Sequence, residues 1–332
     1  MKKILITGAA GFIGSHLTEY LLRKKFKITV FDRYNPFGSF GWLDTIDTSK
    51  KVNFILGDIR DFDSVNNAIK GQDIVIHLAA LIGIPYSYVS PSGYIKTNIE
   101  GTYNVLESSR KNNLSQVIIT STSETYGTAK SNTISENHQL NAQSPYAASK
   151  IAADHLALSY FNSFNLPVKI IRPFNTYGPR QSLRAIIPTI ICQALKSSRI
   201  ELGNLNTSRD LTFIKDTCEA FYRIMNSNKA IGEVINVGSN NNFTIMDLVR
   251  KISKILDKKL QVKKVQKRMR PDKSEVKRLR CNNQKITKIT GWKPKFSKNK
   301  DFEEGLRTTV KWFKNKHNLK FYNEKIMKIY NV

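Results

Sequence analysis

The stretch KILITGAAGFIG, residues 3–14, decides the fold of this chain. The apolar run KILIT predicts a buried strand, and the amphipathic segment IGSHLTEYLLRKK that begins within the stretch predicts a helix. Three glycines lie between them, Gly8, Gly11 and Gly14, and they allow a tight turn and a close approach of the backbone to a ligand. The free N–H groups at the start of the helix would then meet an anion such as a pyrophosphate.

The same alternation continues through the first half of the chain. The runs KITVF, VNFIL, DIVIHLA, QVIIT and VKIIRPF read as strands, and helix-like stretches such as YIKTNIEGTYNVLESSRKN separate them. Repeated βα units predict a parallel sheet with helices on both faces and a ligand crevice at the carboxyl ends of the strands. We therefore predict an α/β fold, a doubly wound parallel Rossmann sheet with a smaller mixed α/β domain toward the C-terminus.

The second predicted strand ends in a carboxylate, Asp32, which fits a dinucleotide site. At about 20 residues beyond the glycines, such an acid accepts hydrogen bonds from the ribose hydroxyls of NAD and repels the extra phosphate of NADP. Because Arg33 is adjacent, NADP remains an alternative cofactor. Asp58 is expected near the adenine, and the small Ala79 and Ala80 would let the dinucleotide lie against the backbone. The full predicted NAD-binding set is Gly8, Gly11, Phe12, Ile13, Gly14, Asp32, Arg33, Asp58, Ile59, Leu78, Ala79, Ala80, Tyr146, Lys150 and Pro173.

A tyrosine and a lysine share one face of a predicted helix, SPYAASKIAADHLALSYF. Tyr146 and Lys150 are four residues apart. A free tyrosine has a pKa of about 10, too high for a base near neutrality. An ammonium group at about 4 Å would favour the phenolate by roughly 4 kcal/mol at an effective dielectric of about 20. Tyr146 is therefore predicted to take a hydroxyl proton near neutral pH.

The segment STSETYG, residues 121–127, follows the strand QVIIT and places polar groups where the predicted crevice opens. Thr122, Ser123 and Glu124 would lie at the carboxyl end of a buried strand. Glu124 has two interpretations at this point. It is an acid or base in catalysis, or it is a first-turn carboxylate that a helix dipole stabilises.

Together these motifs resemble the extended short-chain dehydrogenase/reductase enzymes that modify nucleotide sugars. The resemblance covers nearly the whole chain and rests on GAAGFIG, Asp32, GDIRD, HLAA, STSETYG, YAASK, RPFNTYGPRQ and RDLTFIKDTCEA. In that family 4-epimerases carry small residues at the position of Glu124, and 4,6-dehydratases carry a glutamate. FGWLD, HLAALIGIPYSY, SPYAASK and RPFNTYGPRQS are further similar to the N-acetylglucosamine-nucleotide 4,6-dehydratases of legionaminic-acid-type pathways.

The resemblance implies an NAD-dependent lyase that acts on UDP- or GDP-N-acetylglucosamine. Tyr146 would take the proton of the 4-hydroxyl group while NAD takes the hydride from C4, and Glu124 would take the C5 proton and help the 6-hydroxyl group leave. Thr122 and Ser123 would position these groups. One departure is Ser123, because the dTDP-glucose branch has an aspartate there. The implied catalytic set is Thr122, Ser123, Glu124, Tyr146 and Lys150.

The resemblance also implies a substrate site in which arginines hold the diphosphate, a task that suits a guanidinium fork. Residues 40–43 are expected to help line the sugar pocket, although Trp42 is equally compatible with a core aromatic. His77 is expected to be structural. The implied substrate-binding set is Ile84, Ser87, Asn175, Arg180, Arg209 and Arg270.

The strand and helix pattern changes after Pro173, which predicts two discontinuous domains. Residues 1–175 and 211–238 are assigned to an NAD-binding Rossmann domain, and residues 176–210 and 239–332 to a nucleotide-sugar-binding domain. The resemblance also implies a homodimer joined by a helix pair, with residues 94–112 and 145–165 as candidates.

Composition bears on the other classes of protein. No stretch of about 18 apolar residues occurs, so no membrane span is predicted. Cys192, Cys218 and Cys281 lie far apart without metal-ligand spacing, so we predict no metal site and expect a reducing cytoplasm. The chain has 53 Lys plus Arg against 26 Asp plus Glu, a net charge of +27. Such a field attracts polyanions, but the lysines are spread along the chain, which favours solvated surface lysines over a nucleic-acid site.

Three alternatives remain open. The first is a nucleotide-sugar 4-epimerase that uses the same oxidation step. The second is a UDP-glucuronate decarboxylase, which shares a Ser-Glu-x-Tyr-Gly segment but needs a basic group for the substrate carboxylate, and no pocket motif supplies one. The third is a non-catalytic Rossmann protein that binds nucleic acid through its basic surface. The presence of Glu124, Tyr146 and Lys150 speaks against the third.

Overall fold

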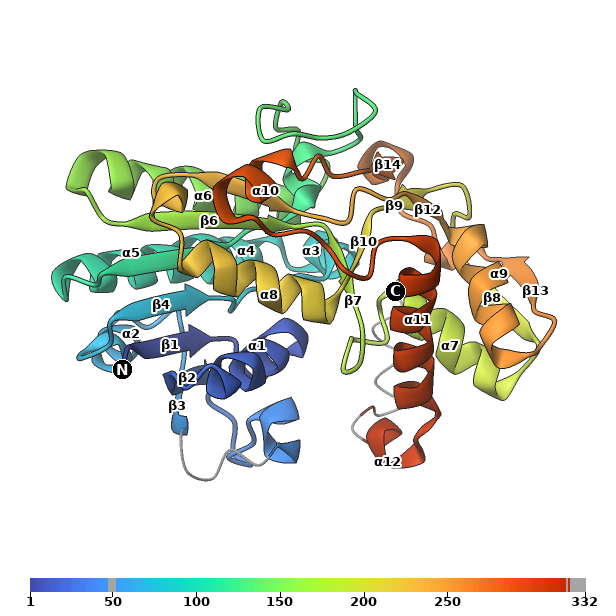
Figure 1. The fold of residues 1–332 in the computed structure, drawn as a ribbon, viewed down its shortest axis with the longest axis horizontal. Helices are drawn as coiled ribbons and strands as arrows, with labels where there is room; N and C mark the ends of the chain where they lie inside the picture. The colour runs from blue at the N-terminus through green and yellow to red at the C-terminus, as the bar shows by residue number, and fades with distance from the viewer. Residues whose placement is uncertain (47–51, 321, 323–332) are drawn as a thin grey trace.

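Seven parallel strands form the central sheet, in the order β11-β6-β5-β4-β1-β2-β3 (Figure 1). The structure, a computed structural model, describes residues 1–46, 52–320 and 322. The strand order reverses beside β1, as it does in a doubly wound sheet. The strands are β1 Lys3–Thr7, β2 Lys27–Arg33, β3 Val52–Gly57, β4 Ile74–His77, β5 Gln116–Thr120, β6 Val168–Pro173 and β11 Val234–Val237.

Apolar residues on both faces of the strands explain why helices cover the sheet on both sides. In β1, Ile4 and Ile6 belong to one buried cluster, and Leu5, which points the other way, belongs to a second. The first cluster includes apolar residues of α1 Phe12–Arg23 and α8 Ile214–Met225. The second includes residues of α2 Phe62–Ile69, α5 Gly101–Lys111 and α6 Pro145–Phe164. The predicted Rossmann sheet is confirmed.

A second group of elements lies beyond one end of the sheet, around α7 Ile186–Lys196, α9 Ile245–Leu256 and α11 Asn299–Lys314 (Figure 1). Small sheets complete it. They contain the pair β7 Asn175–Tyr177 with β10 Leu211–Phe213, the pair β8 Arg199–Leu202 with β13 Gln261–Lys264, and the three strands β9 Ser208–Arg209, β12 Phe243–Thr244 and β14 Arg278–Leu279. The same buried cluster that contains Ile6 also contains Ile190, Leu248 and Phe302. The second group is therefore packed onto the first.

Short helices connect these parts. The helix α10 Gln284–Thr290 packs against α8 and β11, although the predicted boundary assigns residues 239–332 to the substrate domain. The exact division into domains stays a prediction. The other helices are α3 Ile84–Val89, α4 Pro91–Tyr94 and α12 Lys316–Leu319, the π-helix η2 Ile95–Glu100, and the 3-10 helices η1 Gly41–Thr45, η3 Ser123–Tyr126, η4 Asn228–Ala230, η5 Gln266–Arg268 and η6 Asp272–Ser274.

The described part of the chain contains neither a candidate membrane span nor a candidate cluster of metal ligands. No helix among residues 1–46, 52–320 and 322 is long and apolar enough to cross a membrane. Within the same ranges, His, Cys, Asp and Glu side chains do not gather in threes as metal ligands would. The three cysteines are free thiols and are buried.

Candidate active site

The glycine-rich turn joins β1 to α1 and packs against the chain that follows β4. Gly8 has a φ of +72°, and a Cβ atom there would lie 2.6 Å from the backbone nitrogen of Ala79. A Cβ atom at Gly14 would lie 2.3 Å from the carbonyl oxygen of Gly8. Glycine is therefore required at both positions by the packing of the turn itself. Gly11 is exposed, and the nearest contact of a Cβ atom there would be the Gly8 oxygen at 3.4 Å.

The start of α1 leaves its backbone N–H groups available to an anion. Phe12 and Ile13 open the helix, its N-cap Gly11 provides no side-chain hydrogen bond, and the first turn contains no acidic residue. Asp32 accepts a hydrogen bond from the backbone nitrogen of Ala10 at 2.8 Å, so its carboxylate lies at the same turn. These residues fit a dinucleotide whose pyrophosphate meets the helix start and whose ribose meets Asp32.

Three further predicted NAD residues follow β4, which is next to β1, and a fourth, Pro173, lies at the carboxyl end of β6. Leu78 donates its N–H to the Thr7 carbonyl oxygen at 3.1 Å, and Ala79 donates to the Thr7 hydroxyl at 3.3 Å. Ala80 follows them, and Pro173 ends β6. The prediction that small residues follow β4 at the glycine turn therefore agrees with the structure.

Two of three other predicted NAD residues have contacts within the protein. The Arg60 guanidinium binds the carboxylate of Asp58, with the Nε donor at 2.9 Å, and this hydrogen bond lowers the pKa of Asp58. The side chain of Ile59 is buried, and a Cβ atom at Gly101 would lie 2.7 Å from its Cδ1 atom. Arg33 is exposed at the end of β2. The contribution of these three residues to cofactor binding stays a prediction.

The stretch around Trp42 lies over the glycine turn. The backbone nitrogen of Trp42 donates to the Ala10 carbonyl oxygen at 3.3 Å. The Trp42 ring packs against the rings of Trp312 and Tyr322, with centroids 5.4 Å apart in both cases. Leu43 is buried in the main core. The contacts of this stretch thus include the glycine turn, α11 and Tyr322, and its expected place in the sugar pocket stays a prediction.

The segment 121–127 forms a capped 3-10 turn directly after β5. The Thr122 hydroxyl accepts the backbone N–H of Glu124 at 3.2 Å, and Gly127 ends the turn with a φ of +62°. The polar side chains of this turn are buried, with 8% of Thr122, 2% of Ser123 and 9% of Glu124 exposed. A carboxylate is thus held out of bulk water at the carboxyl edge of the sheet.

The helix α6 brings the predicted base to this turn. Ser144 caps it by accepting the N–H of Ala147 at 3.1 Å, and Pro145 occupies the first turn, so Tyr146 lies at the helix start. Tyr146 hydrogen-bonds with Thr122 and lies within the electrostatic reach of Glu124. The structure therefore brings together all five predicted catalytic residues, since Lys150 follows one turn later.

The predicted effect of Lys150 on Tyr146 is wrong for the protein chain by itself. Burial raises the pKa of Tyr146 above its ordinary value, a hydrogen bond with Thr122 lowers it, and the charge of Glu124 raises it. Burial also lowers the pKa of Lys150 to about 8, against the opposing pull of Asp154. Desolvation disfavours both charged forms, and the spacing of the two residues contains no information on it.

Ile84 and Ser87 lie on α3, beside the same tyrosine. Ile84, Tyr94 and Tyr146 form a small buried cluster, with the two tyrosine rings 6.1 Å apart. Ser87 is buried and donates its hydroxyl to the Ile84 carbonyl oxygen at 2.7 Å. His77 is buried between the hydroxyls of Thr7 and Thr102, in agreement with a structural role.

Two of the predicted diphosphate arginines meet near the catalytic turn. Arg209 on β9 and Arg270 both face Glu275, at nitrogen–oxygen distances of 3.5 and 3.9 Å. Burial lowers the pKa of Arg209, and the carboxylates of Glu124 and Glu275 oppose that shift. The Nη1 atom of Arg270 is buried without a hydrogen-bond partner. This arrangement provides donors for an anionic group close to Glu124.

The other two predicted polar substrate residues are placed differently. Asn175 is exposed on β7. Arg180 donates to Glu19 on α1 at 2.7 Å, and its backbone has a φ of +67°. Arg180 therefore joins the loop after β7 to the helix of the dinucleotide turn, and its contact with substrate stays a prediction.

Sequence reasoning missed a buried ion pair behind the catalytic residues. Asp154 on α6 and Arg172 on β6 are 1% and 4% exposed, with an Nη2–Oδ2 distance of 2.8 Å. It also missed Glu275, which lies between the two arginines. Asp154 had a signal, because it follows Tyr146 and Lys150 at the same four-residue spacing. Glu275 had none, because its role depends on contacts between distant parts of the chain.

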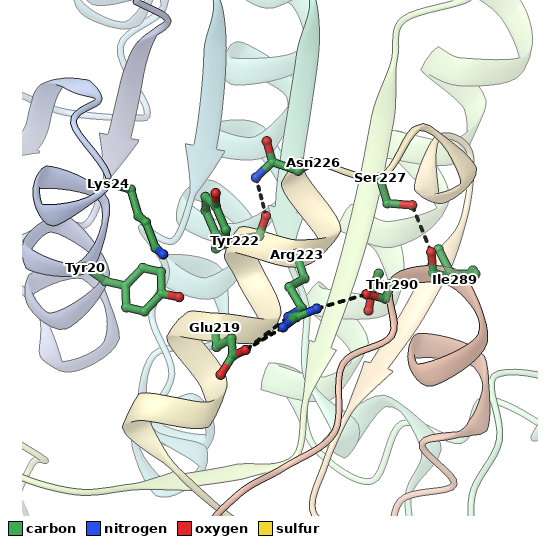
Figure 2. Close-up of a pocket in the computed structure, with 9 residues that line it drawn as sticks. All are labelled: Tyr20, Lys24, Glu219, Tyr222, Arg223, Asn226, Ser227, Ile289 and Thr290. Carbon is green, nitrogen blue, oxygen red and sulfur yellow. Dashed lines mark hydrogen bonds and ion pairs between the residues drawn. The ribbon is translucent and has the colours of Figure 1, made fainter.

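A shallow cavity of about 480 Å³ lies elsewhere, between α1, α8 and α10 (Figure 2). Its lining includes Tyr20, Lys24 and Tyr222, with the Lys24 ammonium 5.1 Å from the Tyr222 ring centre. Arg223 there is paired with Glu219 at 3.0 Å (Figure 2). None of the predicted site residues lines this cavity.

Comparison with known proteins gives concordant matches. The family model described as GDP-mannose 4,6 dehydratase matches residues 5–309. A trifunctional UDP-glucose 4,6-dehydratase/UDP-4-keto-6-deoxy-D-glucose 3,5-epimerase/UDP-4-keto-L-rhamnose-reductase of Arabidopsis thaliana is 32% identical over 94% of the chain. The chain spans only 47% of the length of that plant enzyme.

Two solved structures share the fold over nearly their whole lengths. The dTDP-glucose 4,6-dehydratase of Bacillus anthracis, in complex with NAD, is 30% identical with a TM-score of 0.83, covering 96% of this chain and 98% of its own. The UDP-N-acetylglucosamine 4-epimerase of Methanobrevibacter ruminantium, in complex with UDP-N-acetylmuramic acid, is 31% identical with a TM-score of 0.84, covering 94% and 98%. The matches thus include both dehydratases and epimerases.

Proposed function

The chain belongs to the GDP-mannose 4,6-dehydratase family, within the NAD-dependent epimerases and dehydratases of the extended short-chain dehydrogenase/reductase group, and from this premise we propose that it is a 4,6-dehydratase of UDP- or GDP-N-acetylglucosamine. Its product would be the 4-keto-6-deoxy sugar nucleotide. NAD is the proposed cofactor, supported by the fit of the glycine turn and Asp32 and by the NAD in the related dehydratase structure.

One observation carries the proposal: a buried carboxylate lies in the catalytic turn. Glu124 is 9% exposed and shares the turn with Thr122, to which Tyr146 is hydrogen-bonded. A 4-epimerase only removes and returns a hydrogen at C4, so it has no use for an acid beside C5. A dehydratase needs a group that takes the C5 proton and delivers one to the departing hydroxyl group.

The residues of this chain divide the chemistry between them. Bound NAD would take a hydride from C4, return it at C6 and add a positive charge beside Tyr146. Tyr146 takes the proton of the 4-hydroxyl group, and Thr122 donates a hydrogen bond to the resulting oxygen. The ketone acidifies the C5 hydrogen. Glu124 then takes that proton and passes it to the 6-hydroxyl group, which leaves as water. A proton from solvent would return to C5 through Glu124 when the hydride adds at C6.

The binding residues support a nucleotide-linked sugar. Arg209 and Arg270 present guanidinium groups near Glu124, and such forks bind phosphate oxygens in pairs. Ile84 and Tyr94 give the sugar pocket an apolar wall beside Tyr146. The N-acetyl sugar is proposed from the motif resemblance and from the related UDP-N-acetylglucosamine enzyme.

We also propose a homodimer and a cytoplasmic location. Exposed apolar side chains on α5 and α6 support the dimer, and free buried cysteines support a reducing compartment. The protein would thus work on an activated sugar without a membrane or nucleic-acid partner.

Incubation of the purified protein and NAD with UDP- and GDP-N-acetylglucosamine tests the function. The expected result is loss of one water molecule from one of the two substrates, measured by mass spectrometry, without net NADH. A product of unchanged mass with inverted C4 would indicate an epimerase, and release of carbon dioxide from UDP-glucuronate would indicate a decarboxylase. Turnover of none of the three, together with salt-sensitive RNA binding that nucleotide sugars do not displace, would support the non-catalytic alternative.

A further inference from the structure

A buried ion pair lies directly behind the proposed catalytic residues. The Oδ2 atom of Asp154 accepts hydrogen bonds from the Ser121 hydroxyl at 2.7 Å and from the Arg172 Nε atom at 2.9 Å. Its Oδ1 atom is buried and has no hydrogen-bond partner. An unpaired buried carboxylate oxygen is costly to maintain, so it calls for an explanation beyond packing.

Asp154 continues the catalytic face of α6. Tyr146, Lys150 and Asp154 follow one another at four-residue spacing, so they lie along one side of the helix. They are 7%, 3% and 1% exposed. Burial lowers the pKa of Lys150, and the Asp154 carboxylate opposes that shift.

The partner of Asp154 reaches the turn that carries Glu124. The Arg172 Nη1 atom donates to the Tyr126 hydroxyl at 2.9 Å, and its guanidinium carbon lies 4.9 Å from the centre of the Tyr126 ring. Tyr126 is the last residue of η3 and donates its own hydroxyl to Asn236 at 2.8 Å. Asp154, Arg172 and the Glu124 turn are therefore joined by consecutive contacts, and Lys150 precedes Asp154 by one turn on the same face of α6.

Several other ionisable groups face these residues. His77 on β4 lies within reach of the Lys150 charge, and its burial keeps it neutral by lowering its pKa to about 3. Tyr94 on α4 and Glu124 on η3 act on Tyr146. Arg172 on β6 opposes the charge of Asp154. Loss of Asp154 would consequently remove the negative charge that raises the pKa of Lys150.

We propose that Asp154 and Arg172 are positioning residues, which supply the countercharge that keeps Lys150 protonated and fix the Glu124 turn against α6. This inference rests on the proposed function. Neither residue touches the reacting atoms in this arrangement. Their effect on the reaction passes through Lys150 and through Tyr126.

The pH dependence of turnover tests the electrostatic part. In the proposed mechanism Lys150 acts as an ammonium group, so we expect loss of its proton to set the alkaline limit of activity. Asp154→Asn removes the negative charge, and we expect the alkaline limb of kcat to move down by about one pH unit with little change in KM. Arg172→Gln leaves Asp154 unopposed, and its alkaline limb should move up. Each substitution removes one partner of the same ion pair, yet the two predicted shifts of the alkaline limb have opposite directions.

Controls separate this inference from loss of fold and from failure of the function. Glu107→Gln removes another carboxylate that joins α5 to α6, where it accepts the Tyr160 hydroxyl at 3.1 Å, roughly 15 Å along the helix from Lys150. It should lower the melting temperature without moving the pH profile. D154N/R172Q removes both charges of the Asp154–Arg172 ion pair, so neither partner of that pair is left without the other, and the variant should fold and retain the downward shift.

Each outcome decides one question. A downward shift in Asp154→Asn and D154N/R172Q with an upward shift in Arg172→Gln supports the inference. An unmoved limb in folded Asp154→Asn, or downward shifts in both single variants, overturns it. Absence of turnover in the wild-type protein on every substrate tested would instead overturn the proposed function.

Discussion

The three glycines of the first turn have different physical roles, although the motif treats them alike. Gly8 and Gly14 contact backbone atoms that a Cβ atom would overlap, and Gly8 also needs a positive φ. Gly11 has an ordinary φ of −74° and an open side. The first two are therefore required for folding, and the third is available for binding.

A matched pair of substitutions separates these roles. Gly14→Ala should lower stability by about 1–3 kcal/mol, because its methyl group meets the Gly8 carbonyl oxygen. Gly11→Ala should keep the wild-type melting temperature but weaken NAD binding about tenfold, or ~1.4 kcal/mol, by occupying the approach to the backbone. Thermal denaturation and calorimetric titration with NAD measure the two effects. Equal losses of stability in both variants would contradict this division.

The spacing of Tyr146 and Lys150 predicts where the two residues lie but not their pKa values. Their four-residue spacing was sufficient to predict that they share a helix face near a dinucleotide site. The spacing contains no information on desolvation, because that depends on α3, α4 and β5 packing around them. Burial is the largest cause of the pKa shift in both residues. The charge pair inferred from the sequence therefore predicted a lowered pKa for Tyr146, whereas burial raises it.

At the scale of whole elements, α5 and α6 carry apolar side chains that the described chain leaves exposed. Tyr103 on α5 is 45% exposed and Phe164 on α6 is 52% exposed. The ring centroids of Tyr160 and Phe164 are 5.1 Å apart. Tyr103 is close enough to Tyr160 to contribute to the raised pKa of Tyr160. These rings form a patch across two packed helices, which suits a two-fold interface with a second copy.

Charges placed in this patch should dissociate the proposed dimer. We expect the double variant Y103E/F164E to be monomeric at micromolar concentration and to keep its fold, since both side chains are solvent-exposed. Phe37→Glu, at a position that is 89% exposed outside the patch, should remain dimeric. Sedimentation or light scattering distinguishes the states. A double variant that remains dimeric would place the interface elsewhere.

Elements with strong local patterns were predictable, and elements made by distant contacts were not. The apolar runs that predicted β1 to β6 all lie in the central sheet. Strands β9, β12 and β14 contain two residues each and exist through pairing between residues 208–209, 243–244 and 278–279. The π-helix η2 likewise has no sequence pattern of its own, and its Asn98 is held by Leu81 and Ser149.

At the scale of the molecule, the charge and the substrate site needed the tertiary structure. Between residues 251 and 300, where lysines are frequent, side chains such as Lys254, Lys263 and Lys277 are exposed, as solvated surface residues would be. Arg209 and Arg270 are 61 residues apart, and only the fold brings both to Glu275. Family motifs named both arginines, and their role toward a substrate stays a prediction, but nothing in the sequence indicated the acid between them.

The central claim is that Glu124 eliminates water after oxidation at C4, and the variant Glu124→Gln tests it most directly. The wild-type protein in D2O should yield a product that has lost water and carries solvent deuterium at C5. Glu124→Gln should bind the same nucleotide sugar and show NADH absorbance from oxidation at C4, with water loss reduced at least about a hundredfold. Glu233→Gln, at an exposed carboxylate paired with Lys285, should behave as wild type. Water loss at the wild-type rate in Glu124→Gln would contradict the account.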